Sequence, residues 1–169
     1  MLTLYSPREW LYREMMHQKD TAYIFGGGHV GQALTPILQS IGFQVTIIDP
    51  RKEILLQNKD SAERVIQSSF PEGVQYVEES PSSYAFIMTP GHLSDEETLR
   101  ALLSKKLPYI GMVASKRKSA EILARLKKAG FTAEQIEKVH SPVGIPIKSR
   151  SPAEIAISIV AEIIQLRNK

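Results

Sequence analysis

The sequence contains no cysteine, a single tryptophan and few aromatic residues, which make up 7% of its 169 positions. Without cysteine there is no disulfide scaffold, no thiolate zinc site, no cysteine-ligated iron–sulfur cluster and no cysteine nucleophile. The absence also fits a reducing compartment. Charged residues amount to 23% and hydrophobic ones to 43%, a balance typical of a folded globular domain rather than a disordered chain.

A hydrophobic run long enough to span a membrane is also missing, because spanning takes about 20 apolar residues. The longest helix-like apolar stretch, residues 153–166, is interrupted by two glutamates, a serine and a glutamine. Arg8 and Glu9 stand where a secretory signal would have its apolar core. We therefore expect a cytoplasmic protein that does not enter the membrane.

Charge of one sign is not in large excess, since 21 Lys and Arg are offset by 18 Asp and Glu, for a net charge of +3. This surplus is too small to indicate nucleic-acid binding. Eight of the cations lie within residues 105–128, where Glu121 is the only acid. The pattern favours a solvated helix face over a binding patch.

Short apolar runs alternate with helical segments along most of the chain. The runs predict strands at 21–25, 44–48, 62–67, 84–88 and 109–113. The intervening segments predict helices at 29–40, 51–57, 94–106 and 115–129, a short helix opened by 132–135, and a final helix opened by 151–154. Four strands are continuously apolar, as expected for a parallel sheet covered on both faces. The fold class is therefore α/β: a Rossmann-like, doubly wound, mostly parallel sheet with helices on both faces.

Two units are expected, an N-terminal helix at 1–19 and a Rossmann-like nucleotide-binding domain at 20–169. Ser6 and Glu9 have the spacing of a capping box, and Pro7 fits a first helical position. The final helix is apolar around most of its circumference, so we expect burial on more than one side, under the N-terminal helix or a second copy of the chain. This favours a homodimer.

The strongest local signal is the run Gly-Gly-Gly-His-Val-Gly at 26–31, which holds G-x-G-x-x-G between a strand and a helix. In that context the motif predicts a dinucleotide-binding turn. Gly26 would make the tight turn, Gly28 would admit a pyrophosphate, and Gly31 would pack the helix on the strand. The helix N-terminus favours an anion. The cofactor-binding candidates here are Gly26, Gly27, Gly28, His29, Val30 and Gly31, and His29 either donates to a ligand or packs against the next loop.

Asp49 ends the next strand, 18 residues after Gly31. A carboxylate there can accept hydrogen bonds from a ribose diol, which favours NAD. Arg51 can accommodate the 2′-phosphate of NADP, so the sequence leaves both nucleotides open.

Further candidates follow the later strands, because ligands of open α/β sheets bind outside the carboxyl ends of strands. Thr89, Gly91 and His92 occupy one such end, and His92 is the candidate acid–base residue, with a capped loop histidine as the alternative. Ser115 caps a helix that carries Arg117, and this segment could hold a second phosphate or a carboxylate. The four histidines have no metal-ligand spacing, so no metal site is expected.

Five segments together resemble the C-terminal Rossmann domain of the XdhC/CoxI family, the xanthine dehydrogenase accessory proteins. They are IFGGGHVGQAL, VTIIDPR, FIMTPGHLSDEETL, YIGMVASKRKSAEIL and HSPVGIPIKSRSPAEIAISIVAEII, spread from Ile24 to Ile164. The Gly-rich loop is generic, but its combination with M-T-x-G-H, Y-I-G-M-x-x-S-x-R-K and H-x-P-x-G is specific to the family. Pro90 stands where the family usually has a histidine.

The resemblance implies a factor that binds molybdenum cofactor, or helps its sulfuration and delivery, during maturation of a molybdenum hydroxylase. A cysteine desulfurase and the apo-hydroxylase are the implied partners. Longer family members carry an additional N-terminal domain, whereas about 20 residues precede the first expected strand here. The positions that match family motifs are Gly26, Gly28, Gly31, Asp49, Gly91, His92, Ser115 and Arg117.

Two other functions stay open: an NAD(P)-dependent oxidoreductase with His92 as its acid–base residue, and a nucleotide-sensing regulatory module. No substrate domain is visible beyond the Rossmann unit, which favours an accessory protein without catalysis. The expected cofactor is NAD(P) or molybdenum cofactor, because the dinucleotide form of the latter also carries a pyrophosphate.

Overall fold

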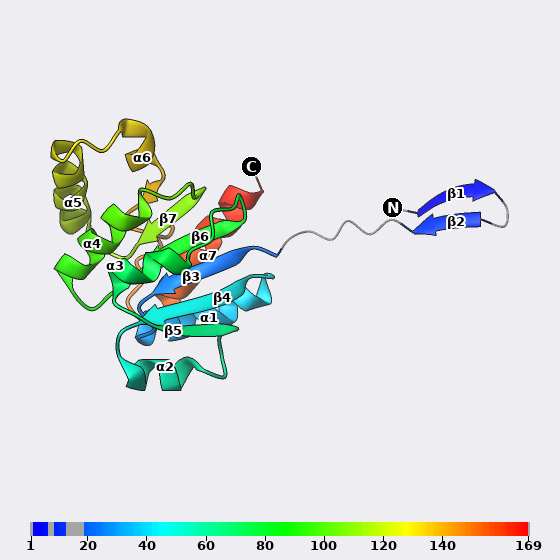
Figure 1. The fold of residues 1–169 in the computed structure, drawn as a ribbon, viewed down its shortest axis with the longest axis horizontal. Helices are drawn as coiled ribbons and strands as arrows, with labels where there is room; N and C mark the ends of the chain where they lie inside the picture. The colour runs from blue at the N-terminus through cyan, green and yellow to red at the C-terminus, as the bar shows by residue number, and fades with distance from the viewer. Residues whose placement is uncertain (1, 7–8, 13–18, 169) are drawn as a thin grey trace.

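The computed structural model describes residues 2–6, 9–12 and 19–168, with side chains from residue 19 onward except that of His92. Its centre is a six-stranded, entirely parallel sheet in the order β5-β4-β3-β6-β7-β8 (Figure 1). The strands are β3 (Thr21–Phe25), β4 (Gln44–Asp49), β5 (Arg64–Gln67), β6 (Ser83–Ile87), β7 (Tyr109–Met112) and β8 (Val139–His140). This is the Rossmann strand order, so the predicted fold class is confirmed.

Helices cover both faces of the sheet. Helices α1 (His29–Ser40), α2 (Lys52–Asn58) and α7 (Pro152–Arg167) bury residues against one face. The other face is covered by α3 (Phe70–Gly73), the 3-10 turn η1 (Val74–Tyr76), α4 (His92–Leu102), α5 (Lys116–Lys128) and α6 (Ala133–Glu137). The order of strands reverses between β3 and β6, which makes their carboxyl ends the topological switch point.

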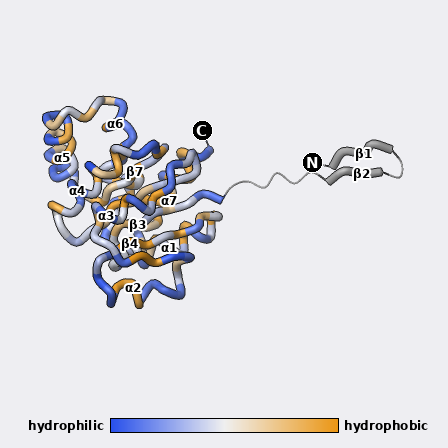
Figure 2. The backbone as a smooth tube through the Cα atoms, viewed as in Figure 1, coloured by the Kyte–Doolittle hydropathy of each residue, from blue (hydrophilic) through white to orange (hydrophobic). Residues whose placement is uncertain are grey.

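The strands are buried on both faces, as their continuous apolar runs predict. In β3, Ala22 and Ile24 join the core under α1 and α7, whereas Tyr23 and Phe25 join the core under α4. Each fully buried large apolar side chain contributes about 1.5–3 kcal/mol to folding. Unlike these continuously apolar strands, the outer helix α5 alternates between hydrophilic and hydrophobic residues, as Figure 2 shows.

The predicted N-terminal helix is wrong for the residues that the structure describes. β1 (Leu2–Ser6) and β2 (Glu9–Tyr12) form a separate antiparallel pair, in which Leu4 lies opposite Trp10. Aromatic and branched residues favour strands, and Ser-Pro initiates turns as well as helices. Residues 13–18 of the expected helix lie outside the described part.

One predicted helix start is also wrong. The helix predicted at 94–106, in which Ser94 has the spacing of a capping residue, instead begins at His92 with Gly91 as its cap residue. Gly91 is extended, with φ −137° and ψ 146°, so the chain can enter the helix directly after Pro90. The carboxylate of Asp95 is engaged elsewhere, as described below.

The other capping predictions are confirmed, and they fix where the late helices start. Ser115 accepts a hydrogen bond from the amide of Lys118 at the start of α5. Thr132 and Ser151 form complete capping boxes at the starts of α6 and α7. Such a cap contributes about 1 kcal/mol to helix stability.

The apolar helix α7 is covered by α1 and the sheet, rather than by an N-terminal helix. Ala156, Ile159 and Ile163 are completely buried there, whereas Ile157 and Ile164 stay exposed at 53% and 41%. Within the described residues, no helix combines the length and the hydropathy that crossing a membrane requires.

Candidate functional site

Two glycines of the Gly-rich loop are required by close backbone approach at the switch point. Gly26 has φ +114°, and a Cβ on it would lie 2.4 Å from the carbonyl oxygen of Met88. A Cβ on Gly31 would lie 2.4 Å from the carbonyl oxygen of Gly26. The first glycine therefore makes the tight turn and the third lets α1 pack on β3, as the motif predicts.

Gly28 has a different surrounding, because a Cβ there would meet nothing within 4 Å. It precedes α1 and has no side chain to cap the first amides of that helix. These amides and the helix dipole make the position suitable for an anion. A hollow of about 240 Å³ opens at this point and is lined by Gly28, His29, Val30, Gly31, Arg51, Met88 and Pro90.

Asp49, at the end of β4, fixes the Gly-rich loop through a hydrogen bond to its backbone. Its Oδ2 accepts hydrogen bonds from the amide of Gly27 at 3.0 Å and from Nη2 of Arg51 at 2.7 Å. Its Oδ1 accepts from the amide of Arg51 at 3.0 Å and from Nε at 2.9 Å. Burial opposes ionisation of this carboxyl, but the bonds from Arg51 and Gly27 outweigh it and hold the pKa of Asp49 below its usual value.

This geometry bears on the ribose contact expected of Asp49. The side chain is completely buried, and each oxygen already receives two hydrogen bonds. The ribose contact stays a prediction. The side chain of Arg51 is 35% exposed and lines the hollow beside Gly28, so it places a positive charge there.

Asn58, which the sequence reasoning missed, holds the loop from the other side. Its Nδ2 donates to the carbonyl oxygens of Gly27 at 2.9 Å and Ile54 at 2.7 Å, and the side chain is completely buried. An asparagine at the end of a helix suggests only a local cap. The bond across 31 residues to Gly27 has no sequence signal.

At the end of β6, Thr89 is bound to a buried ion pair. Its hydroxyl donates to Oδ1 of Asp95 at 2.5 Å, and its amide donates to the same oxygen at 3.2 Å. The other oxygen of Asp95 pairs with Nζ of Lys118 on α5. Asp95 lies on α4 and is 1% exposed, so the ion pair is a buried link between α4 and α5.

His29, Ser115 and Arg117 line two separate hollows. His29 is exposed beside Gly28. Ser115 and Arg117 line a separate hollow of about 310 Å³ along α5, and Arg117 is 90% exposed and pairs with Glu121 at 3.8 Å. His92 is the first residue of α4, but its side chain lies outside the described part of the structure. Its ligand contact stays a prediction.

Taken together, the sheet order, the Gly-rich turn and the hollow at the start of α1 define a Rossmann-type domain. The XdhC Rossmann domain family matches residues 22–163, so the chain belongs to that family. This confirms the resemblance seen in the sequence.

The chain is similar to three known proteins. It is 32% identical over 147 residues to protein YqeB of Escherichia coli K12, covering 86% of this chain and 27% of YqeB. It is 27% identical over 162 residues to a probable xanthine dehydrogenase subunit of Bacillus subtilis 168, and the match covers 94% of this chain and 46% of that protein. A crystal structure of a xanthine dehydrogenase from Bacillus halodurans superposes with a TM-score of 0.77 at 30% identity. The match covers 89% of this chain and 43% of that structure. The chain thus spans less than half the length of these proteins, and it is an XdhC-type Rossmann domain related to xanthine dehydrogenase accessory proteins.

The distinct role of Gly28 gives a first prediction. Gly28→Val has room to fold, and it should weaken binding of ADP at least tenfold, because the side chain occupies the approach of the pyrophosphate. Calorimetric titration measures the affinity. As a contrast, Gly31→Ala should melt lower, since its Cβ meets the Gly26 carbonyl. An unchanged ADP affinity in folded Gly28→Val would refute this site.

The Asp49 carboxylate gives a second prediction, on pH. The pKa of Asp49 is lower in the folded protein than the value of 3.8 expected in the unfolded chain. The ionised carboxylate therefore stabilises the fold at any pH above that unfolded-state pKa. This contribution is lost as the pH falls through the folded-state pKa. Asp49→Asn should therefore be less stable than the wild type by about 1–3 kcal/mol at neutral pH, with the difference shrinking in acid. Urea denaturation at neutral pH and in acid, below the unfolded pKa, measures both. Exposed Asp60→Asn is the control, and a difference independent of pH contradicts the prediction.

Proposed function

We propose that this chain is the nucleotide-binding unit of a cytoplasmic accessory factor for the maturation of a molybdenum hydroxylase, and that it works by binding rather than by turnover. It holds a ligand that contains a pyrophosphate at residues 26–31. The observation that carries the proposal is the open space at Gly28, at the positive end of α1 and at the switch point of the sheet. The names of the related proteins of Bacillus subtilis and Bacillus halodurans support the link to xanthine dehydrogenase.

Two kinds of ligand share the required pyrophosphate: molybdenum cofactor in its dinucleotide form, and NAD(P). Arg51 would supply a cation beside the phosphates in either case, since its guanidinium lines the hollow at Gly28. We favour the molybdenum cofactor, because the family relation connects the chain to molybdenum hydroxylases.

The third prediction concerns the ligand retained by the purified protein. Native mass spectrometry of the chain purified without oxygen should show a pterin dinucleotide on the wild type and its loss from Gly28→Val. A retained nicotinamide nucleotide would instead support the oxidoreductase or the sensing module. Occupancy equal in the wild type and in folded Gly28→Val would count against binding at this loop.

The proposed partners are an apo-hydroxylase, which receives the cofactor, and a cysteine desulfurase. These 169 residues include no cysteine, so a persulfide would be carried outside them. Binding of the chain to a purified apo-hydroxylase, compared with the same enzyme loaded with cofactor, tests the proposal. Preference for the loaded enzyme would contradict a role in delivery.

We also propose that the chain self-associates through α7. Ile157 and Ile164 lie seven residues apart, on one side of the helix, and both are exposed. The fourth prediction is that Ile157→Glu with Ile164→Glu shifts the protein to monomer in sedimentation velocity at tens of micromolar. Gln165→Glu adds a charge to the same helix at another exposed position and should leave the dimer intact. A monomeric wild type would exclude this contact.

A further inference from the structure

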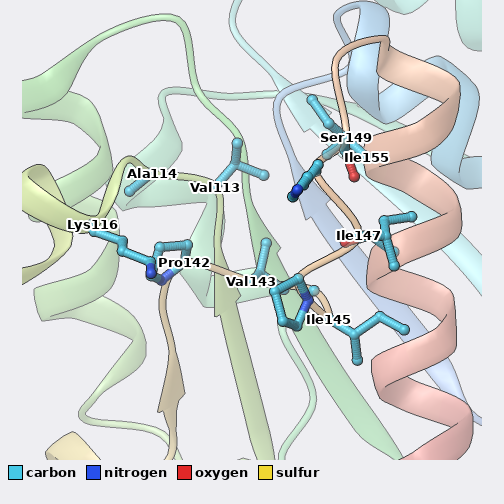
Figure 3. A pocket seen from close by; sticks show the side chains of 13 residues that line it. Val113, Ala114, Lys116, Pro142, Val143, Ile145, Ile147, Ser149 and Ile155 are labelled. Carbon is cyan, nitrogen blue, oxygen red and sulfur yellow. The ribbon is translucent and has the colours of Figure 1, made fainter.

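A hollow of about 660 Å³, larger than the two described above, lies beyond the carboxyl end of β7. Pockets for small molecules commonly measure about 300–1,000 Å³. Figure 3 shows Val113, Ala114 and Val143 toward β7, with Ile147 and Ile155 on the side of α7. Most of the lining side chains are apolar, as in pockets that bind small organic molecules.

The wall formed by residues 142–149 is fixed before any ligand arrives. The amide of Val143 donates to the Met112 carbonyl at 3.1 Å, and the amide of Ile145 donates to the Ser158 carbonyl at 3.2 Å. Gly144 has φ +95°, and a Cβ on it would lie 2.0 Å from Oγ of Ser158. The loop therefore packs directly on α7 and pre-forms the hollow.

Glu162 of α7 accepts three hydrogen bonds, one from this loop and two from the ends of β7 and β8. Its Oε2 accepts from the Gly144 amide at 2.8 Å, and its Oε1 accepts from the Tyr109 hydroxyl at 2.8 Å and from Nδ1 of His140 at 2.9 Å. Burial opposes ionisation of Glu162, but the bonds from His140, Tyr109 and Gly144 outweigh it, and its pKa lies below the usual value.

Two cations line the hollow. Lys116 begins α5, and Lys148 lies in the loop with φ +59°. Farther along α5, Arg117, Lys118 and Arg125 are paired with carboxylates. Within the described residues, no carboxylate lies within 4.0 Å of the amino group of Lys116 or Lys148. These two charges are therefore available to an anionic group on a ligand.

The hollow and the Gly-rich loop lie at the same edge of the sheet, because all the strands between them are parallel. β7 is two strands from β3, a separation of about 10 Å at the usual strand spacing. Pro90, which follows β6 between them, lines the hollow at Gly28. A ligand bound by its pyrophosphate at Gly28 can therefore extend toward β7.

We propose that the hollow at residues 113–116 and 142–149 is a second ligand subsite, which takes a planar heterocycle bearing an anionic substituent. This heterocycle is the far half of the ligand whose pyrophosphate lies at Gly28, so the inference rests on the proposed function. Val143 and its apolar neighbours contact the ring, and Lys116 and Lys148 contact the anionic substituent.

The fifth prediction uses three probes in calorimetry: ADP, NAD+ and nicotinic acid adenine dinucleotide, which carries a carboxylate in place of the nicotinamide amide. The acid dinucleotide should bind at least tenfold more tightly than ADP, and more tightly than NAD+. Val143→Trp fills the hollow and should reduce the acid dinucleotide to the affinity of ADP, while ADP itself binds as before. Leu56→Trp, at an exposed position on α2, is the matched control.

Lys116→Gln tests the charge without altering the wall, since the side chain is exposed. It should abolish the preference for the acid dinucleotide over NAD+, and Lys128→Gln at the far end of α5 should not. Equal affinities of ADP and the acid dinucleotide for the wild type, or an equal loss of both in Val143→Trp, would overturn the subsite. Failure of ADP to bind at all would overturn the proposed phosphate site instead.

A pterin dinucleotide and a pyridine dinucleotide both carry a planar heterocycle beyond the pyrophosphate. The anionic dithiolene of molybdopterin would supply the substituent that Lys116 and Lys148 contact, whereas the nicotinamide of NAD+ carries a neutral amide. Native mass spectrometry of wild-type and Val143→Trp proteins purified without oxygen identifies which of them fills the hollow. Loss of the retained ligand from Val143→Trp, but not from Leu56→Trp, supports the subsite, and equal retention by both variants contradicts it.

Discussion

The structure depends on the close approach of backbone to backbone where β3 meets α1. There is no room for a side-chain atom between Gly26 and the Met88 carbonyl, nor between Gly31 and the Gly26 carbonyl. These contacts set the distance of α1 from the sheet and bring the end of β6 against the turn. The start of α1 therefore lies over the switch point, where its unpaired amides make the position suitable for an anion.

The turn is rigid because Gly27 is held at both of its polar groups. Its amide donates to the buried carboxylate of Asp49, and its carbonyl accepts from Asn58. Arg51 neutralises Asp49, so the buried acid does not repel a phosphate at the same edge. A loop ordered in advance loses little conformational entropy on binding, which favours affinity.

The strands and most helices could be predicted from the sequence, since apolar runs and caps such as Ser151 are local signals. Local signals also explain the errors. Ser6 and Glu9 have the spacing of a capping box but lie in paired strands, and Ser94 has the spacing of a cap but lies inside α4. A short motif shows that a helix can start at a position, whereas the pairing of neighbouring segments decides whether it does.

The site was predictable only in its glycines and charges. The supporting contacts of Asn58, Lys118 and Glu162 join residues 31, 23 and 53 positions apart. The hollow beside β7 has walls from a strand end, a loop and two helix starts. Such sites arise from the assembled fold, so no single stretch of sequence indicates them.

The hydrogen bond from Gly144 to Glu162 makes the hollow beside β7 depend on the last helix. The loop at 142–149 is held by the last helix of the fold, so the hollow exists only while α7 is docked. Local opening of α7 and ligand occupancy of the hollow are therefore mutually exclusive. By linkage, a ligand there slows hydrogen exchange in α7, and whatever displaces α7 releases the ligand. For the ligand that we propose, binding and release would thus be tied to the stability of the carboxyl-terminal helix.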